Sequence, residues 1–211
     1  MVFHFKKALS LRQGLSRRTE QGSGLNRDKY SSYLSQLKKC RRIARRLNRW
    51  GHYNQRATLY RIKARILERG TSRNRLTRRL IKQLREKASG EILFHLYDFL
   101  GITSRYLEFK PGQALTNFLE AQKKAPFFPA RVNLNIAELL YMQNKPARSL
   151  HYILLLTEKY NDSVDYNILQ KSRRLAGFIF FYNQKYEKAC HYLQQTGGSL
   201  TAGNREANEY L

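Results

Sequence analysis

Apolar residues recur at alternating steps of three and four positions between Asp28 and Gly51. They are Tyr30, Tyr33, Leu37, Cys40, Ala44 and Leu47. This spacing aligns them along one side of an α-helix, which predicts an amphipathic helix that ends near the glycine. Basic residues occupy most positions around this apolar stripe, and the segment 38–50 contains seven positive charges and no negative one.

Two further amphipathic helices are predicted next. The second covers residues 55–69, with Leu59, Ile62 and Ile66 on its apolar side and Arg56, Lys63 and Arg65 elsewhere. Gly70 suits the left-handed conformation that follows a helix end, and Ser72 is expected to cap the third helix. That helix has inward positions at Leu76, Leu80 and Leu84 and is expected to close at Gly90. Three consecutive apolar seams predict that these helices pack together and hold their basic faces rigidly.

Beyond Glu91 the chain becomes apolar and aromatic, and the stretch to Phe109 is expected to be core. Pro111 fits the first turn of another helix. Three later segments then share a pattern. Offsets zero, three, nine, twelve and sixteen carry Gly177, Phe180, Tyr186, Ala189 and Leu193 in the last segment, and Ala137, Leu140, Pro146, Ser149 and Ile153 in the middle one. The first segment matches only over its second helix, at Ala114, Phe118, Ala121 and Pro126.

Small residues are needed where two antiparallel helices cross, so Ala137 is expected against Ser149 and Gly177 against Ala189. Over residues 91–195 the pattern resembles the tetratricopeptide repeat, a helix–turn–helix unit of about 34 residues. Pro146 departs from the family's usual aromatic residue and Leu140 from its usual tyrosine, and a 40-residue step between Ser149 and Ala189 predicts a longer helix or loop near 160–166. A related hairpin array and a general helical bundle remain alternatives. The expected fold is therefore all-α, with a basic helical segment followed by a tetratricopeptide-like helical-hairpin array.

The resemblance implies a protein-interaction scaffold with no catalytic role. Arrays of this family bind peptides or partner helices along the concave surface formed by their first helices. The groove residues carried over onto this sequence are Asn133, Arg173 and Arg174. A protein partner is therefore expected on the helical repeats.

Charge divides the chain unevenly. The net charge is +25, and residues 1–90 hold 26 Lys and Arg against four acidic residues, a balance of +22, which leaves +3 for the remainder. Like charges four residues apart on a helix destabilise it by about 0.2–0.5 kcal/mol per pair, so the excess indicates that a partner supplies the counter-charge.

Nucleic acid is the expected polyanion, because arginine forks hold phosphates and aromatic rings stack on bases. The candidate residues are Lys38, Lys39, Arg41, Arg42, Arg45, Arg46, Arg49, Trp50, Tyr53, Arg56, Arg73, Arg75, Arg78 and Arg79. RNA, with ribosomal RNA as the leading candidate, is favoured over DNA, because the charge extends over three helices and no short recognition helix is evident. The alternatives are an adaptor whose basic half docks on an acidic protein or a membrane surface, and a DNA-binding regulator.

No enzyme chemistry is indicated. The sequence has no phosphate-binding loop, dinucleotide fingerprint, HExxH or GxSxG motif, and its five histidines are scattered. Cys40 and Cys190 are far apart and have no metal-ligand spacing, so neither a metal nor another cofactor is expected. No apolar run approaches the length of a membrane span, and a transmembrane segment is not expected.

The two ends of the chain differ in composition from the region between them. Residues 1–27 form a basic arm, whose first 19 residues hold five Lys or Arg and no acid. Such starts are typical of mitochondrial presequences, although an arm that orders on a polyanion is the alternative. The basic helical region is assigned to 28–90, the repeats to 91–195 and a polar tail to 196–211. The combination is similar to lineage-specific helical-repeat subunits of mitochondrial ribosomes, which implies the mitochondrial matrix, with the cytoplasm as the alternative.

Overall fold

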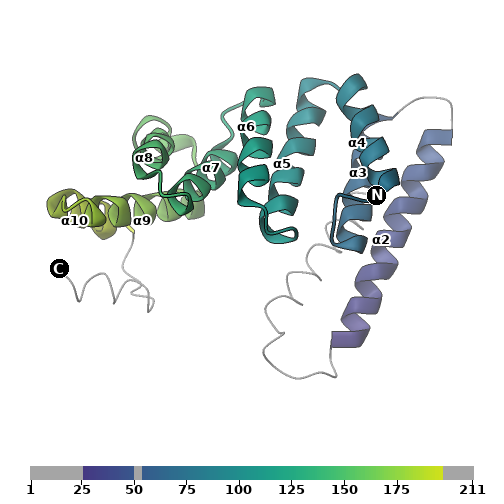
Figure 1. Ribbon diagram of the computed structural model, residues 1–211, viewed down its shortest axis with the longest axis horizontal. Helices are drawn as coiled ribbons and strands as arrows, with labels where there is room; N and C mark the ends of the chain where they lie inside the picture. Colours follow the sequence, from purple (N-terminus) through teal and green to yellow (C-terminus); the bar gives the residue numbers. More distant parts are fainter. Residues whose placement is uncertain (1–25, 50–53, 197–211) are drawn as a thin grey trace. The chain divides into compact units, whose positions relative to one another are not determined.

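The computed structural model describes residues 26–49 and 54–196, and all regular secondary structure in these residues is helical. The predicted all-α fold is therefore confirmed (Figure 1). The α-helices are α2 (Asn26–Arg49), α3 (Gln55–Arg69), α4 (Arg75–Lys87), α5 (Gly90–Tyr106), α6 (Pro111–Lys124), α7 (Ala130–Met142), α8 (Pro146–Leu154), α9 (Tyr166–Tyr182) and α10 (Tyr186–Gln194). A π-helix η1 (Leu155–Lys159) and a 3-10 turn η2 (Asn161–Ser163) lie between α8 and α9.

The chain divides into two compact units between Ala114 and Leu115. The charge pattern changes near residue 90, but the apolar core of the first unit continues beyond it. Ile92, Leu96 and Phe99 of α5 share one buried cluster with residues of α2, α3 and α4. The first unit therefore includes the apolar helix α5 together with the three basic helices.

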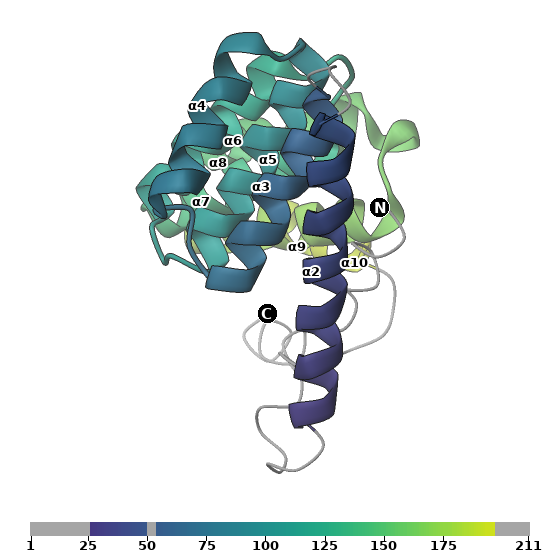
Figure 2. The same cartoon turned by 90° about the vertical axis from the view of Figure 1, so that its right-hand side faces the viewer.

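Helices α2 and α3 pack against each other along the apolar stripe predicted from the sequence (Figure 2). Leu37 and Cys40 of α2 are buried in the same cluster as Leu59 and Ile62 of α3. Gly70 has a φ of 71° and donates its backbone N–H to the carbonyl of Ile66, as expected of a residue that ends a helix. The exposed basic positions of both helices are thus fixed by the burial of their apolar ones.

Helix α4 is rotated relative to the predicted apolar stripe. Leu80 and Leu84 are buried as expected, but Leu76 is 36% exposed and Ile81 lies in the core instead. Thr77 is also buried. The buried face of α4 is therefore centred between the row of Leu80 and Leu84 and the row of Thr77 and Ile81. A helix packed in a bundle buries a face wider than one row of residues at every fourth position.

The two caps around α4 also differ from the prediction. Asn74, and not Ser72, precedes the helix and accepts the backbone N–H of Leu76 through its side chain. Ser72 instead donates both its backbone N–H and its hydroxyl to Oε1 of Glu108, at 2.7 Å each. Gly90 does not close α4, which ends at Lys87; it is the first residue of α5.

The second unit contains two helical hairpins, α7–α8 and α9–α10. Ser149 is fully buried and donates its hydroxyl to the carbonyl of Ala137 at 2.7 Å, so the predicted crossing point of the first hairpin is confirmed. In the second hairpin, a Cβ atom added to Gly177 would lie 2.5 Å from Cγ of Leu193, one helical turn beyond the buried Ala189. Small residues therefore bring the helices of both hairpins close together.

Three turns between helices have the same local geometry. The non-glycine residues with positive φ among the described residues are Phe109, Asn144 and Gln184, with φ of 52°, 56° and 58°. Each is followed by a lysine whose carbonyl accepts the backbone N–H four positions on, at the small residues Ala114, Ser149 and Ala189. The spacing read from the sequence thus corresponds to a recurring turn.

The hairpins are separated by the longer connection expected near residues 160–166. Helix α8 continues into η1, and η2 follows before Asp165 caps α9 by accepting the N–H of Asn167. Tyr192 of α10 donates its hydroxyl to Oε1 of Glu158 in η1 at 2.7 Å. Burial and this hydrogen bond raise the pKa of Tyr192 to about 12. The connection between the hairpins therefore packs against α10 through η1.

Candidate nucleic-acid interface

Helix α2 presents its cations to solvent because its apolar stripe faces α3. Lys38, Lys39, Arg42, Arg45 and Arg46 are all exposed. Within the part of the chain that the structure describes, none of them forms an ion pair with a carboxylate. Lys39, Arg42 and Arg46 are spaced at i, i+3 and i+7, which places them on one face of the helix. This face is therefore an exposed row of positive charge on α2.

Arg41 differs from its neighbours on α2. It is half-buried, and its guanidinium pairs with the carboxylate of Glu68 on α3. The pair joins two packed helices, so Arg41 serves the fold of this unit. It is the one candidate of the described α2 cluster whose charge is neutralised inside the chain.

Helix α4 carries a second exposed basic face. Arg75, Arg78 and Arg79 are exposed, opposite the buried Leu80 and Leu84. Arg73 is exposed just before the helix. The candidates on α2 and α4 thus lie on two helices that both pack against α3.

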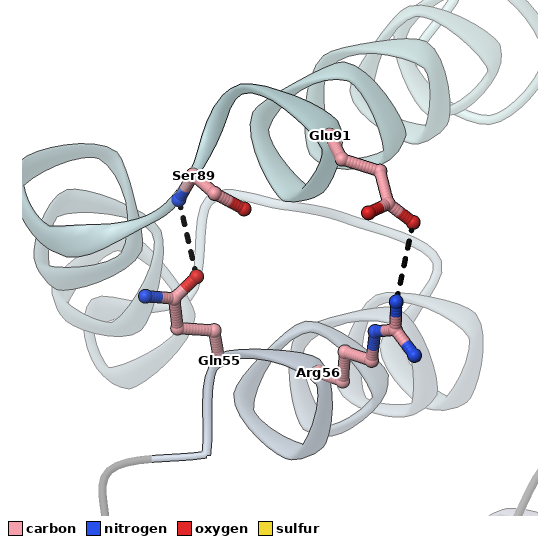
Figure 3. A network of polar contacts seen from close by, with 4 residues as sticks. All are labelled: Gln55, Arg56, Ser89 and Glu91. Carbon is pink, nitrogen blue, oxygen red and sulfur yellow. Dashed lines mark hydrogen bonds and ion pairs between the residues drawn. The ribbon is translucent and has the colours of Figure 1, made fainter. Parts of the chain in front are cut away.

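Arg56 of α3 takes part in a polar network with the start of α5 (Figure 3). Its Nη2 lies 3.3 Å from Oε1 of Glu91, and both side chains are largely exposed. The neighbouring Gln55 accepts the backbone N–H of Ser89 at 3.1 Å and donates to the carbonyl of Lys87 at 2.9 Å. Gln55 thus fixes the junction between α4 and α5, and the Arg56 pair is an exposed addition to it.

The described glutamates of the first unit are engaged within the chain. Glu68 and Glu91 pair with arginines, and Glu86 lies 4.0 Å from Lys82. Burial opposes ionisation of Glu108, but hydrogen bonds from Ser72 and Thr71 outweigh it and lower the pKa of this carboxyl. These carboxylates therefore leave the exposed basic faces of α2 and α4 uncompensated.

The structure also identifies basic residues that the sequence did not single out. Arg61 and Arg65 of α3 lie near arginines of α2, Arg61 near Arg41 and Arg45 and Arg65 near Arg41. Arg69 of α3 lies near Arg65, and we call these five residues the arginine seam. Burial, then the charges of Arg45 and Arg41, lowers the pKa of Arg61. Arg65 was expected away from the apolar side but is only 6% exposed. The four-residue spacing of the α3 arginines was a visible signal, but it did not reveal that α2 supplies charges of the same sign.

Three candidates cannot be placed in this interface. Trp50 and Tyr53 lie outside the described residues. Arg49 is the last residue of α2, and its side chain also lies outside what the structure describes.

The predicted groove residues of the second unit are not brought together as one surface. Asn133 is 1% exposed and accepts a hydrogen bond from Gln122 at 2.7 Å, so its expected place in an accessible groove is wrong. Arg173 donates to the carbonyl of Gln195 at 3.2 Å, which satisfies the end of α10. Arg174 is exposed. Asn133 and Arg173 thus form contacts within the second unit. The repeat pattern identifies positions on the first helix of each hairpin, and some of these positions face a neighbouring helix.

A different exposed feature occurs on the second unit. Met142 and Tyr182 are the last residues of α7 and α9, 40 positions apart, and are 67% and 72% exposed. Tyr141, next to Met142, is close enough to Tyr182 that its pKa is raised, first by burial and then by that second phenol. The recurring turns therefore expose a large side chain at the same position of each hairpin.

Within residues 26–49 and 54–196, no group of three or more His, Cys, Asp or Glu side chains is arranged to hold a metal ion. No helix in these ranges combines the length and apolar character that crossing a membrane requires.

Compared with protein-family models, curated proteins and solved structures, the chain gives no significant match to any of the three.

Proposed function

We propose that this chain is a non-enzymatic RNA-binding scaffold, in which the basic faces of α2 and α4 contact RNA and the carboxyl-terminal hairpins bind a protein partner. The observation that carries the proposal is the separation of charge in the first unit. Its described glutamates have partners within the chain, whereas Lys39, Arg42 and Arg46 point a row of cations outward. A surface selected for solubility alone would mix both signs.

RNA supplies the missing charge at a low energetic cost. Each phosphate that a Lys or Arg neutralises releases a counterion, and log affinity falls with log salt by about 0.7 per contact on a single strand. Arginine, which predominates on α2 and α4, holds phosphate oxygens bidentately. Rigid helices lower the entropic cost, because the cations are already in place before binding.

The test reverses the charge of one face. In the full chain, Lys39→Glu, Arg42→Glu and Arg46→Glu are combined, and filter retention of a single-stranded RNA is measured over a range of salt. We expect at least about a tenfold loss of affinity and a shallower salt dependence, by about 0.7 for each phosphate that the variant no longer neutralises. Far-ultraviolet circular dichroism checks that helicity is retained, since all three side chains are exposed.

A matched control reverses three exposed cations of the second unit, Arg148, Lys171 and Lys185, and should retain RNA binding. Wild-type affinity and salt slope in the α2 variant would reject the proposal. Sequence-selective binding to duplex DNA that exceeds RNA binding would favour a DNA-binding regulator instead.

The protein-binding part of the proposal is supported by the exposed Met142 and Tyr182 at the ends of equivalent helices. A photocrosslinking amino acid in place of Tyr182 should give a ribonuclease-resistant adduct with one protein in cells. The same probe at the exposed Tyr166, the first residue of α9, should not give that adduct. Adducts that are identical at both positions would indicate non-specific contact.

We place this scaffold in the mitochondrial matrix, as a ribosome-associated subunit, on the basis of the presequence-like composition of residues 1–27. Fusion of these residues to a fluorescent protein should direct it to mitochondria. Cytoplasmic fluorescence, together with ribonuclease-sensitive sedimentation with cytoplasmic ribosomes, would move the scaffold to that compartment.

A further inference from the structure

We propose that the arginine seam between α2 and α3 is a distinct phosphate-binding site, which seats one backbone phosphate of the bound RNA against Arg61, Arg65 and Arg69. The identity of the ligand rests on the proposed RNA-binding function. The site itself rests on separate observations, because the exposed faces of α2 and α4 described above do not include these three residues.

The helical spacing brings the arginines of the seam together. Arg61, Arg65 and Arg69 are spaced at i, i+4 and i+8, so they form one row along α3. Arg41 and Arg45 are likewise four residues apart on α2, which packs against α3. The pair between Arg41 and Glu68 shows that this side of α2 reaches the row on α3.

The arginine seam contains more donors than the described residues satisfy. Arg65 is buried, with 6% of its surface exposed, and among the described residues Nε of Arg61 and Nε of Arg65 have no hydrogen-bond partner. Glu68 is the carboxylate whose charge acts on Arg65, and Arg41 already pairs with it. Buried donors normally have acceptors, so these two nitrogen atoms point to an acceptor that the described residues do not supply.

The charges of the seam favour an anion of high charge density. Burial, followed by the charges of Arg41, Arg69 and Arg61, lowers the pKa of Arg65, and Glu68 offsets only part of this effect. A phosphate group relieves repulsion among several guanidiniums at once, and its oxygens match their planar forks. Arg69 is exposed, Arg61 is half-buried and Arg65 between them is buried, so the row has two accessible ends and an enclosed middle.

The experiment compares the full chain with two variants. The seam variant carries Arg61→Gln and Arg69→Gln, and the control variant carries Arg148→Gln and Lys171→Gln, two exposed cations of the second unit. Melting temperatures are measured in sodium phosphate and in sodium chloride at equal ionic strength. Wild type and control should melt about 2–4 °C higher in phosphate, as expected for a site well above half saturation, and the seam variant should lose this shift.

A second comparison separates ligand binding from a structural role. In chloride alone the seam variant should melt no lower than wild type, because the substitutions remove like charges. It should also show an RNA salt slope shallower by about 0.7, which corresponds to one neutralised phosphate. Equal phosphate shifts in all three proteins, or a seam variant that is less stable in chloride, would overturn the site. A seam-specific phosphate shift in a chain that fails to bind RNA would support the site and reject the proposed function.

Discussion

The hydroxyl of Ser149 donates a hydrogen bond to the carbonyl of Ala137 across the α7–α8 hairpin, and both residues are fully buried. A small residue is required here because the two backbones come close together. The hydroxyl adds a specific contact to this close approach. The pair therefore fixes both the distance and the register of the hairpin.

Ser149→Ala should test the hydrogen bond, and Ser149→Leu the close approach. We expect a loss of about 0.5–1.5 kcal/mol in the free energy of unfolding for alanine, and a larger loss for leucine through overpacking. Urea denaturation measures both, with Arg148→Ala at the adjacent exposed position as the control. Equal stability of the leucine variant and wild type would mean that the helices do not cross at this residue.

Gly177 makes an equivalent prediction for the α9–α10 hairpin. A Cβ atom at position 177 would lie 2.5 Å from Cγ of Leu193, so Gly177→Ala should lower the free energy of unfolding by about 1–3 kcal/mol. Adding Leu193→Ala should recover part of this loss in a double-mutant cycle, because the clash is removed. Gly112→Ala is the control, since no atom beyond its chain neighbours and its own helix backbone lies within 4 Å of the added Cβ; it should be neutral or stabilising. Additive effects at Gly177 and Leu193 would contradict the contact.

Arg41 and Arg42 should respond differently to the same substitution. Arg41→Glu places two carboxylates together at Glu68 and is expected to cost about 1–3 kcal/mol, whereas Arg42→Glu should change stability by no more than about 0.5 kcal/mol. Chemical denaturation distinguishes the two variants. Combining Arg41→Glu with Glu68→Arg should restore part of the stability, and a failure of this exchange would show that the ion pair is not the cause.

Glu108 makes the stability of the first unit dependent on pH. Its folded pKa is lowered from the ordinary value of 4.5, so its contribution is present above that pH and is lost as the pH falls through the folded pKa. Glu108→Gln should therefore be less stable than wild type near neutral pH, and the difference should shrink in acid. Thermal melts from neutral to acidic pH measure this difference in stability. The control is Glu86→Gln, because Glu86 is exposed and pairs only with the exposed Lys82 among the described ion pairs. A difference that does not vary with pH would show that the ionised form is not the one that Ser72 binds.

The sequence alone was sufficient to predict the amphipathic helices of the first unit and the point at which α7 and α8 cross. Leu37 and Cys40 are buried where the three- and four-residue steps placed them, since a helix of fixed period must bury the row of apolar residues it carries. Ala137 and Ser149 were likewise identified from spacing, because only small residues allow two backbones to come this close. The exposed cations on α2 follow from the same periodicity, as the complement of the buried row.

The tertiary structure decided which polar groups meet. Nothing in the local pattern marks Glu108 as the partner of Ser72, 36 residues away, or distinguishes Arg41, which pairs with Glu68, from its exposed neighbour Arg42. The burial of Asn133 and the gathering of Arg61 and Arg65 beside α2 depend on how helices pack, and packing places residues that are distant in the chain at contact distance. Periodicity within one helix fixes which side faces inward, but only the neighbouring helix determines what each inward or lateral side chain will touch.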